Sequence, residues 1–195
     1  MKTLLNIWQS VKLYFLFVTI LFIGAFLYGY YSESVHLLLQ SQLEGLSEVA
    51  ASINDAQGKL FGLIFFNNTI KSIFFMYGGL LFGLLPFIFI VVNGAMIGYV
   101  VHLLGSMEGT GVMELVVKGL LPHGIIEIPI LLLASAYGVM LGVSVIRKLL
   151  SPNRAITLEP VMLLRQSGVV VVFMTISLLL AAFIEAYIST FLLQI

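Results

Sequence analysis

The sequence predicts an all-α membrane protein: a polytopic bundle of about five transmembrane helices, with one amphipathic helix outside the bilayer. Hydrophobic residues make up 61% of the chain and charged residues only 9%, whereas about a quarter of the residues in a soluble domain are charged. The mean hydropathy of +1.13 points the same way. We predict that residues 1–195 form a single membrane domain that is in contact with membrane lipids.

The first predicted span covers residues 11–31. Its start is basic, like a signal peptide, but the apolar stretch is about twenty residues long and lacks a small-residue cleavage site, so we expect a retained anchor. The cluster of Tyr28, Tyr30 and Tyr31 at its end is typical of a membrane interface.

An amphipathic helix is predicted next, at about residues 33–57. Apolar residues recur there every three or four positions between Val35 and Ile53, which is the pattern of one helix face. Its polar face is acidic. The helix either lies across the ends of its own bundle or offers a docking surface to a partner protein.

The apolar stretch over residues 60–104 is too long for one crossing, and Pro86, with Gly83 three residues before it, is the natural break because proline ends or kinks a helix. We therefore predict a second span at 68–85 and a third at 86–104. A fourth span at 122–146 and a fifth at 167–193 complete the bundle.

The distribution of basic residues predicts a cytoplasmic N-terminus and an external C-terminus in the cell membrane, because cytoplasmic loops are rich in Lys and Arg. Three basic residues would be external: Lys59, Lys71 and Lys118. Six would be cytoplasmic: Lys2, Lys12, Arg147, Lys148, Arg154 and Arg165.

Three pairs of glycines are spaced by four residues, which lets helix backbones approach closely in lipid. They are Gly79 and Gly83, Gly94 and Gly98, and Gly138 and Gly142. We expect these pairs to form contacts within the bundle; a homodimer interface is the alternative for one of them.

Polar side chains at membrane depth are costly unless they are satisfied, so each needs a reason. Five form a predicted buried polar cluster: Asn68, Asn93, His123, Glu127 and Glu185. His123 and Glu127 lie four residues apart and share a helix face. They form a structural hydrogen-bonded clamp, or two ligands of a divalent metal ion with Glu185 or His102 as a third ligand, or groups that act in catalysis or a proton relay.

Composition and motifs exclude several functions. Nine basic residues balance nine acidic ones, so nothing favours nucleic-acid binding. Without cysteine there is no disulfide, thiolate metal site or cysteine nucleophile. Common intramembrane protease and serine hydrolase motifs are absent from the sequence. Apart from the metal considered above, we expect no cofactor.

Three stretches, FFNNTIKS, VVNGAMIGYV and LPHGIIEIPILLLASAYG, resemble the stage II sporulation protein M family of membrane proteins. The resemblance extends over nearly the whole chain. It implies a multi-pass protein that anchors peptidoglycan-degrading membrane proteins while the septal wall is remodelled during engulfment. A scaffold without catalytic residues is therefore the first interpretation. The alternatives are a metal-dependent intramembrane enzyme using His123 and Glu127, and a small transporter or channel acting as a dimer.

Overall fold

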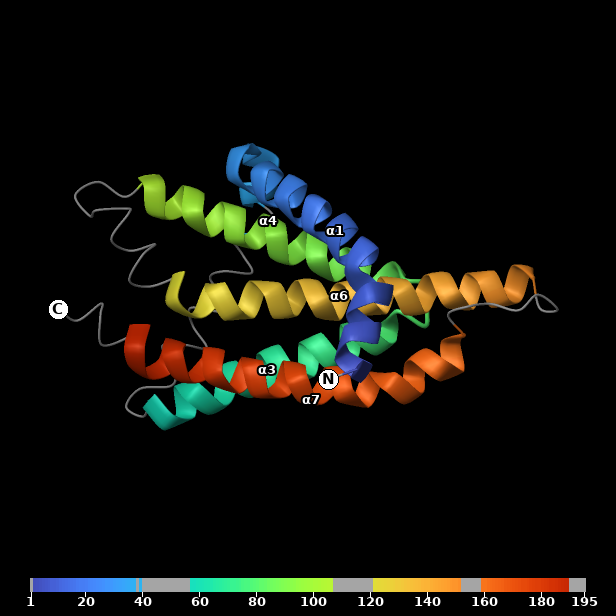
Figure 1. Ribbon diagram of the computed structural model, residues 1–195. Helices are drawn as coiled ribbons and strands as arrows, with labels where there is room; N and C mark the ends of the chain where they lie inside the picture. The colour runs from blue at the N-terminus through green and yellow to red at the C-terminus, as the bar shows by residue number, and fades with distance from the viewer. Residues whose placement is uncertain (1, 38, 40–56, 107–120, 152–158, 190–195) are drawn as a thin grey trace.

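Five long α-helices and one short π-helix form a bundle in the computed structural model, which describes residues 2–37, 39, 57–106, 121–151 and 159–189 (Figure 1). The helices are α1 Lys2–Tyr31, α3 Gln57–Gly78, α4 Leu84–Ser106, α6 Leu121–Leu150, α7 Pro160–Phe183 and the π-helix η2 Ile184–Ser189. In these ranges, five helices are long and apolar enough to cross a membrane. The predicted all-α bundle of about five spans is confirmed.

The bundle has two ends, which we name after the residues that mark them. At the Tyr31 end, α1 and α4 end and α3 and α6 begin, and η2 ends there too. At the Leu150 end, α3 and α6 end and α4 and α7 begin. Figure 1 shows the helices running between these ends side by side.

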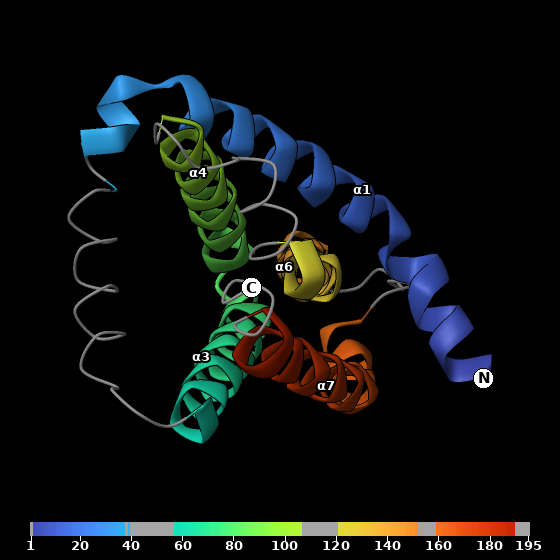
Figure 2. The same cartoon turned by 90° about the vertical axis from the view of Figure 1, so that its left-hand side faces the viewer.

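Helix α6 is the centre of the bundle. Figure 2 shows it with α1, α4, α3 and α7 arranged around it. Two thirds (67%) of the most apolar stretch of α6 is buried, against 17–39% for the other spans. The surrounding helices therefore expose much of their apolar surface, as expected of helices that face lipid.

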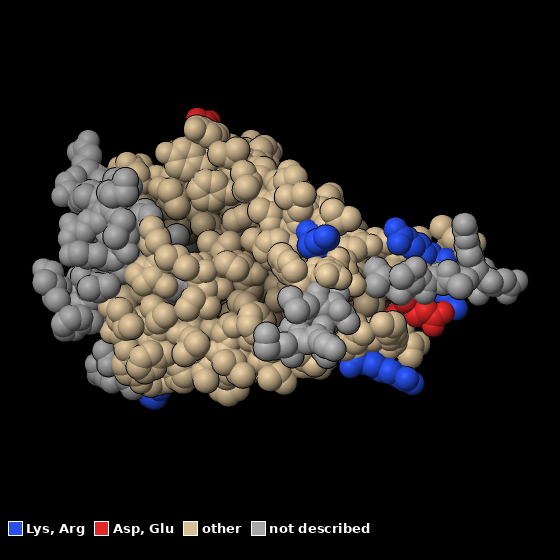
Figure 3. All heavy atoms as spheres, in the orientation of Figure 1, with Lys and Arg blue, Asp and Glu red and all other residues tan. Residues whose placement is uncertain are grey.

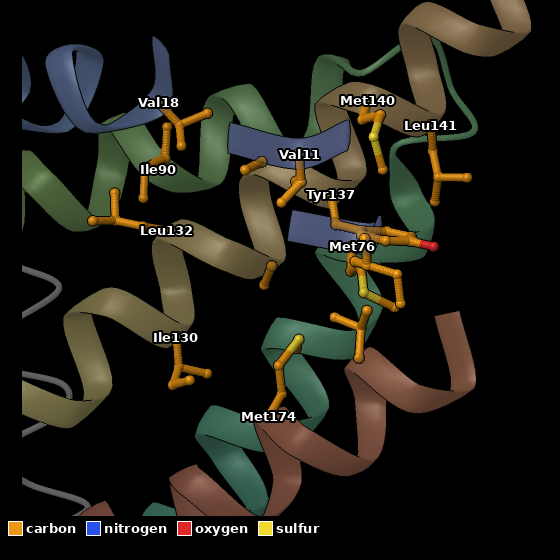
Figure 4. Packing of buried hydrophobic residues seen from close by; sticks show 14 of the residues in the cluster. Val11, Val18, Met76, Ile90, Ile130, Leu132, Tyr137, Met140, Leu141 and Met174 are labelled. Atoms are coloured by element: carbon orange, nitrogen blue, oxygen red, sulfur yellow. The ribbon is translucent and has the colours of Figure 1, made fainter. Parts of the chain in front are cut away.

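The core consists of side chains from all five long helices (Figure 4). Val11 and Val18 of α1 and Met76 of α3 are fully buried. So are Ile90 of α4 and Tyr137 of α6. Tyr137 donates a hydrogen bond of 2.7 Å to the carbonyl of Leu163 in α7, which satisfies the one polar atom that its buried ring carries.

Helix α7 is also held by α3 near the Leu150 end. The hydroxyl of Tyr77 lies 2.7 Å from that of Ser167. Ser167 donates its own proton to the carbonyl of Leu164 at 2.8 Å, so Tyr77 is the donor between the two hydroxyls. Charged side chains visible in Figure 3 gather largely at this end, beyond an uncharged body.

The break between the second and third spans is not at Pro86, as predicted, but in a turn over residues 79–83. Helix α3 ends at Gly78, and Phe82 and Gly83 have left-handed φ angles of 58° and 78°. Such angles stop a helix, and glycine adopts them without steric cost. Pro86 lies in the first turn of α4, where its missing N–H breaks no helical hydrogen bond.

Other predicted boundaries were also displaced. Helix α3 begins at Gln57 and not near residue 68, and α7 begins at Pro160 and not near residue 167. Helix α6 continues through Pro129 as one helix from Leu121 to Leu150. Most of the predicted amphipathic helix, residues 40–56, lies outside the described residues.

The six glycines of the predicted pairs lie where two backbones meet within the chain. A Cβ atom added to Gly79 would meet the backbone of Gly138, and one added to Gly142 would meet Gly83. On the other side of the bundle, α4 packs closely on α1. A Cβ on Gly94 would lie 2.8 Å from the carbonyl oxygen of Phe22, and one on Gly98 would meet the backbone of α1 as well.

Candidate functional site

A cavity of about 350 Å³ lies between α3, α4, α6 and η2 in the half of the bundle nearer the Tyr31 end. Four of the predicted polar residues line it: Asn68 of α3, Asn93 of α4, Glu127 of α6 and Glu185 of η2. Each comes from a different element, so the residues are brought together only by the packing of the bundle. The cavity is the candidate functional site.

The π-helix brings Glu185 to this cavity. A π-helix has a wider turn than an α-helix and frequently occurs at functional sites. The ring of Tyr187 in η2 lies 6.4 Å from that of Phe61 in α3 and 4.9 Å from that of Phe183 in α7. These aromatic contacts hold η2 against α3 near the start of α3.

The side-chain amide of Asn93 bonds to its own helix and also borders the cavity. Its NH₂ group donates a hydrogen bond of 2.8 Å to the carbonyl of Phe89, one turn earlier in α4. The amide oxygen takes no part in that bond. It is therefore the polar atom of Asn93 that can accept a hydrogen bond from a group in the cavity.

Among the described residues, Glu185 and Lys71 are close enough to Glu127 to interact with it electrostatically. Lys71 lies on α3, one turn beyond Asn68, and its side chain is exposed. Its positive charge attracts the carboxylate of Glu127, whereas the charge of Glu185 repels it.

The structure tests the metal hypothesis only in part. The backbone of His123 lies in the first turn of α6, but its side chain is outside the described residues. Within the described part of the chain, no group of three His, Asp or Glu side chains could hold a metal ion. His102 does not line the cavity.

His102 instead belongs to an aromatic cluster between α4 and the segment after α1. Its ring centroid lies 4.3 Å from that of His36, which also stacks on Tyr99 at 4.8 Å. A nitrogen of His36 lies 2.9 Å from the carbonyl oxygen of Gly29. The sequence analysis did not single out His36, because a lone histidine beyond a span carries no spacing signal.

One polar lining residue was missed from the sequence. Asn67 precedes Asn68 in α3 and also lines the cavity. The Asn-Asn pair in FFNNTIKS was visible in the sequence, but two neighbouring residues of a helix point about 100° apart. Without the wide cavity in view, only one of them could be expected to face inward.

The model of one protein family, stage II sporulation protein M, matches residues 13–190. The chain belongs to this family. The match covers α1 from residue 13 onward, the other four candidate membrane spans in full, and the whole lining of the cavity. No curated protein and no solved structure matches the chain. Family membership and the five apolar helices together indicate a multi-pass membrane protein of the sporulation protein M family.

Proposed function

We propose that this protein is an integral membrane scaffold that holds peptidoglycan-degrading partner proteins at the membrane while the septal wall is remodelled. Membership of the stage II sporulation protein M family supports the conclusion that the chain is a sporulation membrane protein. The scaffold role itself is our inference from the resemblance and from the architecture.

The observation that carries this proposal is the way the bundle is held together. Its close backbone contacts join the turn after α3 to α6, at Gly79 and Gly142, and α4 to α1, at Gly94 and Gly98. Such contacts hold helices together in lipid, and the peripheral helices leave apolar faces on which the transmembrane helices of partners could pack. Examples are Leu13 of α1, 71% exposed, and the similarly exposed residues Ile20, Phe74, Val172 and Ile176.

The experiment is site-specific photo-cross-linking in living cells of the source organism. A photoreactive amino acid is placed at Leu13, Phe74 or Val172, one on each of three exposed helix faces. We expect one face to give a cross-link to a peptidoglycan-degrading membrane protein, identified by mass spectrometry. Leu141, which is fully buried in α6, is the control position and should give none.

If no exposed face cross-links to a wall-degrading protein in cells that are remodelling their septum, the scaffold proposal is wrong. A further measurement addresses the enzyme alternative. Metal analysis of the purified protein should find no stoichiometric divalent ion, and a chelator should leave its melting temperature unchanged. Stoichiometric metal that is lost in both His123→Ala and Glu127→Gln would favour a metal-dependent enzyme instead.

A further inference from the structure

A smaller, apolar groove lies on the outside of the bundle between α1, α6 and α7, and its volume is about 200 Å³. Helices α1 and α7 pack on α6 from two sides, and among the described residues they have little contact with each other (Figure 2). Part of α6 is therefore left uncovered between them. The walls of the groove are formed by Ile7, Trp8 and Val11 of α1, Leu133 of α6, and Val170 and Phe173 of α7.

The surroundings of this groove are lipid, because all three helices are long and apolar enough to cross a membrane. Val170 lies ten residues after the start of α7 at the Leu150 end, which is about 15 Å along the helix. The hydrocarbon of a bilayer is roughly 30 Å thick, so an acyl chain from the membrane surface at the Leu150 end reaches the groove. A transmembrane helix, about 10–12 Å wide with its side chains, is too large for it.

Lys12 places a positive charge beside the groove. It is the one charged residue in the candidate span Ile7–Tyr31, and its side chain is exposed. It follows Trp8 by one helical turn, so the Cβ atoms of the two residues lie about 5–6 Å apart on one face of α1. A helical side chain leans toward the N-terminus of its helix, so that of Lys12 leans away from the Tyr31 end, and its long stem extends the ammonium group toward the lipid head groups.

The charges around Lys12 favour an anionic ligand. Residues 1–32 contain no Asp or Glu, and Lys12 forms no ion pair with any described residue. Glu159 is the one described acidic residue at the Leu150 end, and it is paired with Lys148 at 3.0 Å. A lysine within a membrane span is costly unless its charge is satisfied, and basic residues near a membrane surface attract anionic lipids.

From these observations we infer that the groove between α1, α6 and α7 binds one acyl chain of an anionic phospholipid, whose phosphate group pairs with Lys12. The chain lies against Trp8 of α1, Leu133 of α6 and Phe173 of α7. This lipid site goes beyond the scaffold role and does not rest on it.

The test is the quenching of Trp8 fluorescence by phospholipids with brominated acyl chains, in vesicles that contain the full chain. Trp8 is the single tryptophan and lines the groove, so a brominated chain bound there quenches it. Brominated phosphatidylglycerol, which is anionic, is compared with brominated phosphatidylcholine, which is zwitterionic, each diluted with the other lipid in unbrominated form. We expect phosphatidylglycerol to be preferred about fivefold beside Trp8, which is the effect of one basic residue near a membrane surface.

Two matched variants locate the charge that causes this preference. Lys12→Gln should abolish it, so that the two lipids quench Trp8 equally. Arg147→Gln removes the same charge from an exposed position of α6, fourteen residues and about 21 Å along the helix from Leu133, and should keep the fivefold preference.

A third variant tests the groove itself. Leu133→Phe fills it without changing any charge, and the readout is the phospholipid that the purified protein retains, measured by native mass spectrometry. We expect the wild type to retain phosphatidylglycerol and Leu133→Phe to retain less than half as much. If Leu133→Phe does not fold, Ile7→Phe narrows the groove from α1 and takes its place.

Equal quenching by the two lipids in the wild type would overturn the proposal, and so would an unchanged preference in Lys12→Gln. An equal loss in Arg147→Gln would show a general attraction to the charged end and no site at Lys12. Undiminished retention in a folded groove-filling variant would exclude the groove, and quenching by neither lipid would show that protein covers it. The cross-linking experiment reports on protein partners and this one on lipid, so failure of either proposal can be told from failure of the other.

Discussion

Gly29 and Gly24 form a matched pair that tests how closely α1 and α4 pack. Both lie in α1, five residues apart. A Cβ atom added to Gly29 would lie 2.6 Å from the Cα and 2.7 Å from the carbonyl carbon of Ala95 in α4. A Cβ added to Gly24 would have no neighbour within 4 Å.

The expected magnitudes follow from these distances. Carbon atoms in contact prefer about 3.5–4.0 Å, so Gly29→Ala requires the two helices to separate by about 1 Å. Because the obstacle is backbone, no side-chain rotation relieves it, and such overpacking costs about 1–3 kcal/mol. Alanine is a better helix former than glycine by about 1 kcal/mol, a gain that both variants share. Gly24→Ala should therefore be more stable than the wild type, and Gly29→Ala less stable than Gly24→Ala by about 1–3 kcal/mol.

The assay is reversible unfolding in mixed micelles with increasing dodecyl sulfate, followed by the fluorescence of Trp8, the single tryptophan of the chain. Trp8 lies in α1, and its ring packs edge-on against Phe15 at 5.5 Å. Equal stability of the two variants would refute the close backbone contact between Gly29 and Ala95. Greater stability of Gly29→Ala than of the wild type would do so as well.

Two other outcomes are expected. If the N-terminus is cytoplasmic, a cysteine at Ser106 should react with an impermeant maleimide added outside intact cells, and a cysteine at Ser151 should not. The chain itself has no cysteine that would add to the labelling. The reverse labelling pattern would contradict the predicted orientation. Tyr77→Phe and Ser167→Ala should each lower the unfolding free energy by about 0.5–1.5 kcal/mol, and a double variant no worse than either single one would show that the two hydroxyls act as one bond.

The number of spans could be predicted from the sequence because it depends on length and hydropathy alone. The break between α3 and α4 was predicted a few residues too late, because the boundary was set at Pro86 and not at the turn that ends with Gly83. Pro86 attracted the prediction, yet proline is tolerated in the first turn of a helix. Phe82 and Gly83 have left-handed angles, and Gly83 lies against Val139 of α6, a long-range contact that sequence spacing does not reveal.

The polar residues could be identified and grouped from the sequence, but the cavity that four of them line could not. Membrane depth follows from position along a span, and it suggested that Asn68, Glu127 and Glu185 lie in the same half of the bundle. Whether they share a cavity depends on the rotation of each helix about its axis, which is set by tertiary contacts. For Glu185 the local structure was also unexpected, since no sequence pattern predicts a π-helix at residues 184–189.

One face of α6 takes part both in the close packing of the bundle and in the lining of the cavity. Glu127, Leu131, Gly138 and Gly142 follow one another at intervals of four, seven and four residues, so they lie on one helix face. Towards the Leu150 end this face meets the end of α3 and the turn after it, with glycine on α6 and no side chain between the backbones.

Towards the Tyr31 end, the same face of α6 borders the cavity with Glu127 and Leu131. The close contact at the Leu150 end and the cavity nearer the Tyr31 end therefore both depend on the distance between α3 and α6. The glycines of α6 set that distance. A larger residue at Gly138 would push the backbone of Met76 and the ring of Pro86 away from α6. Because those atoms belong to α3 and α4, the same displacement would alter the walls of the cavity.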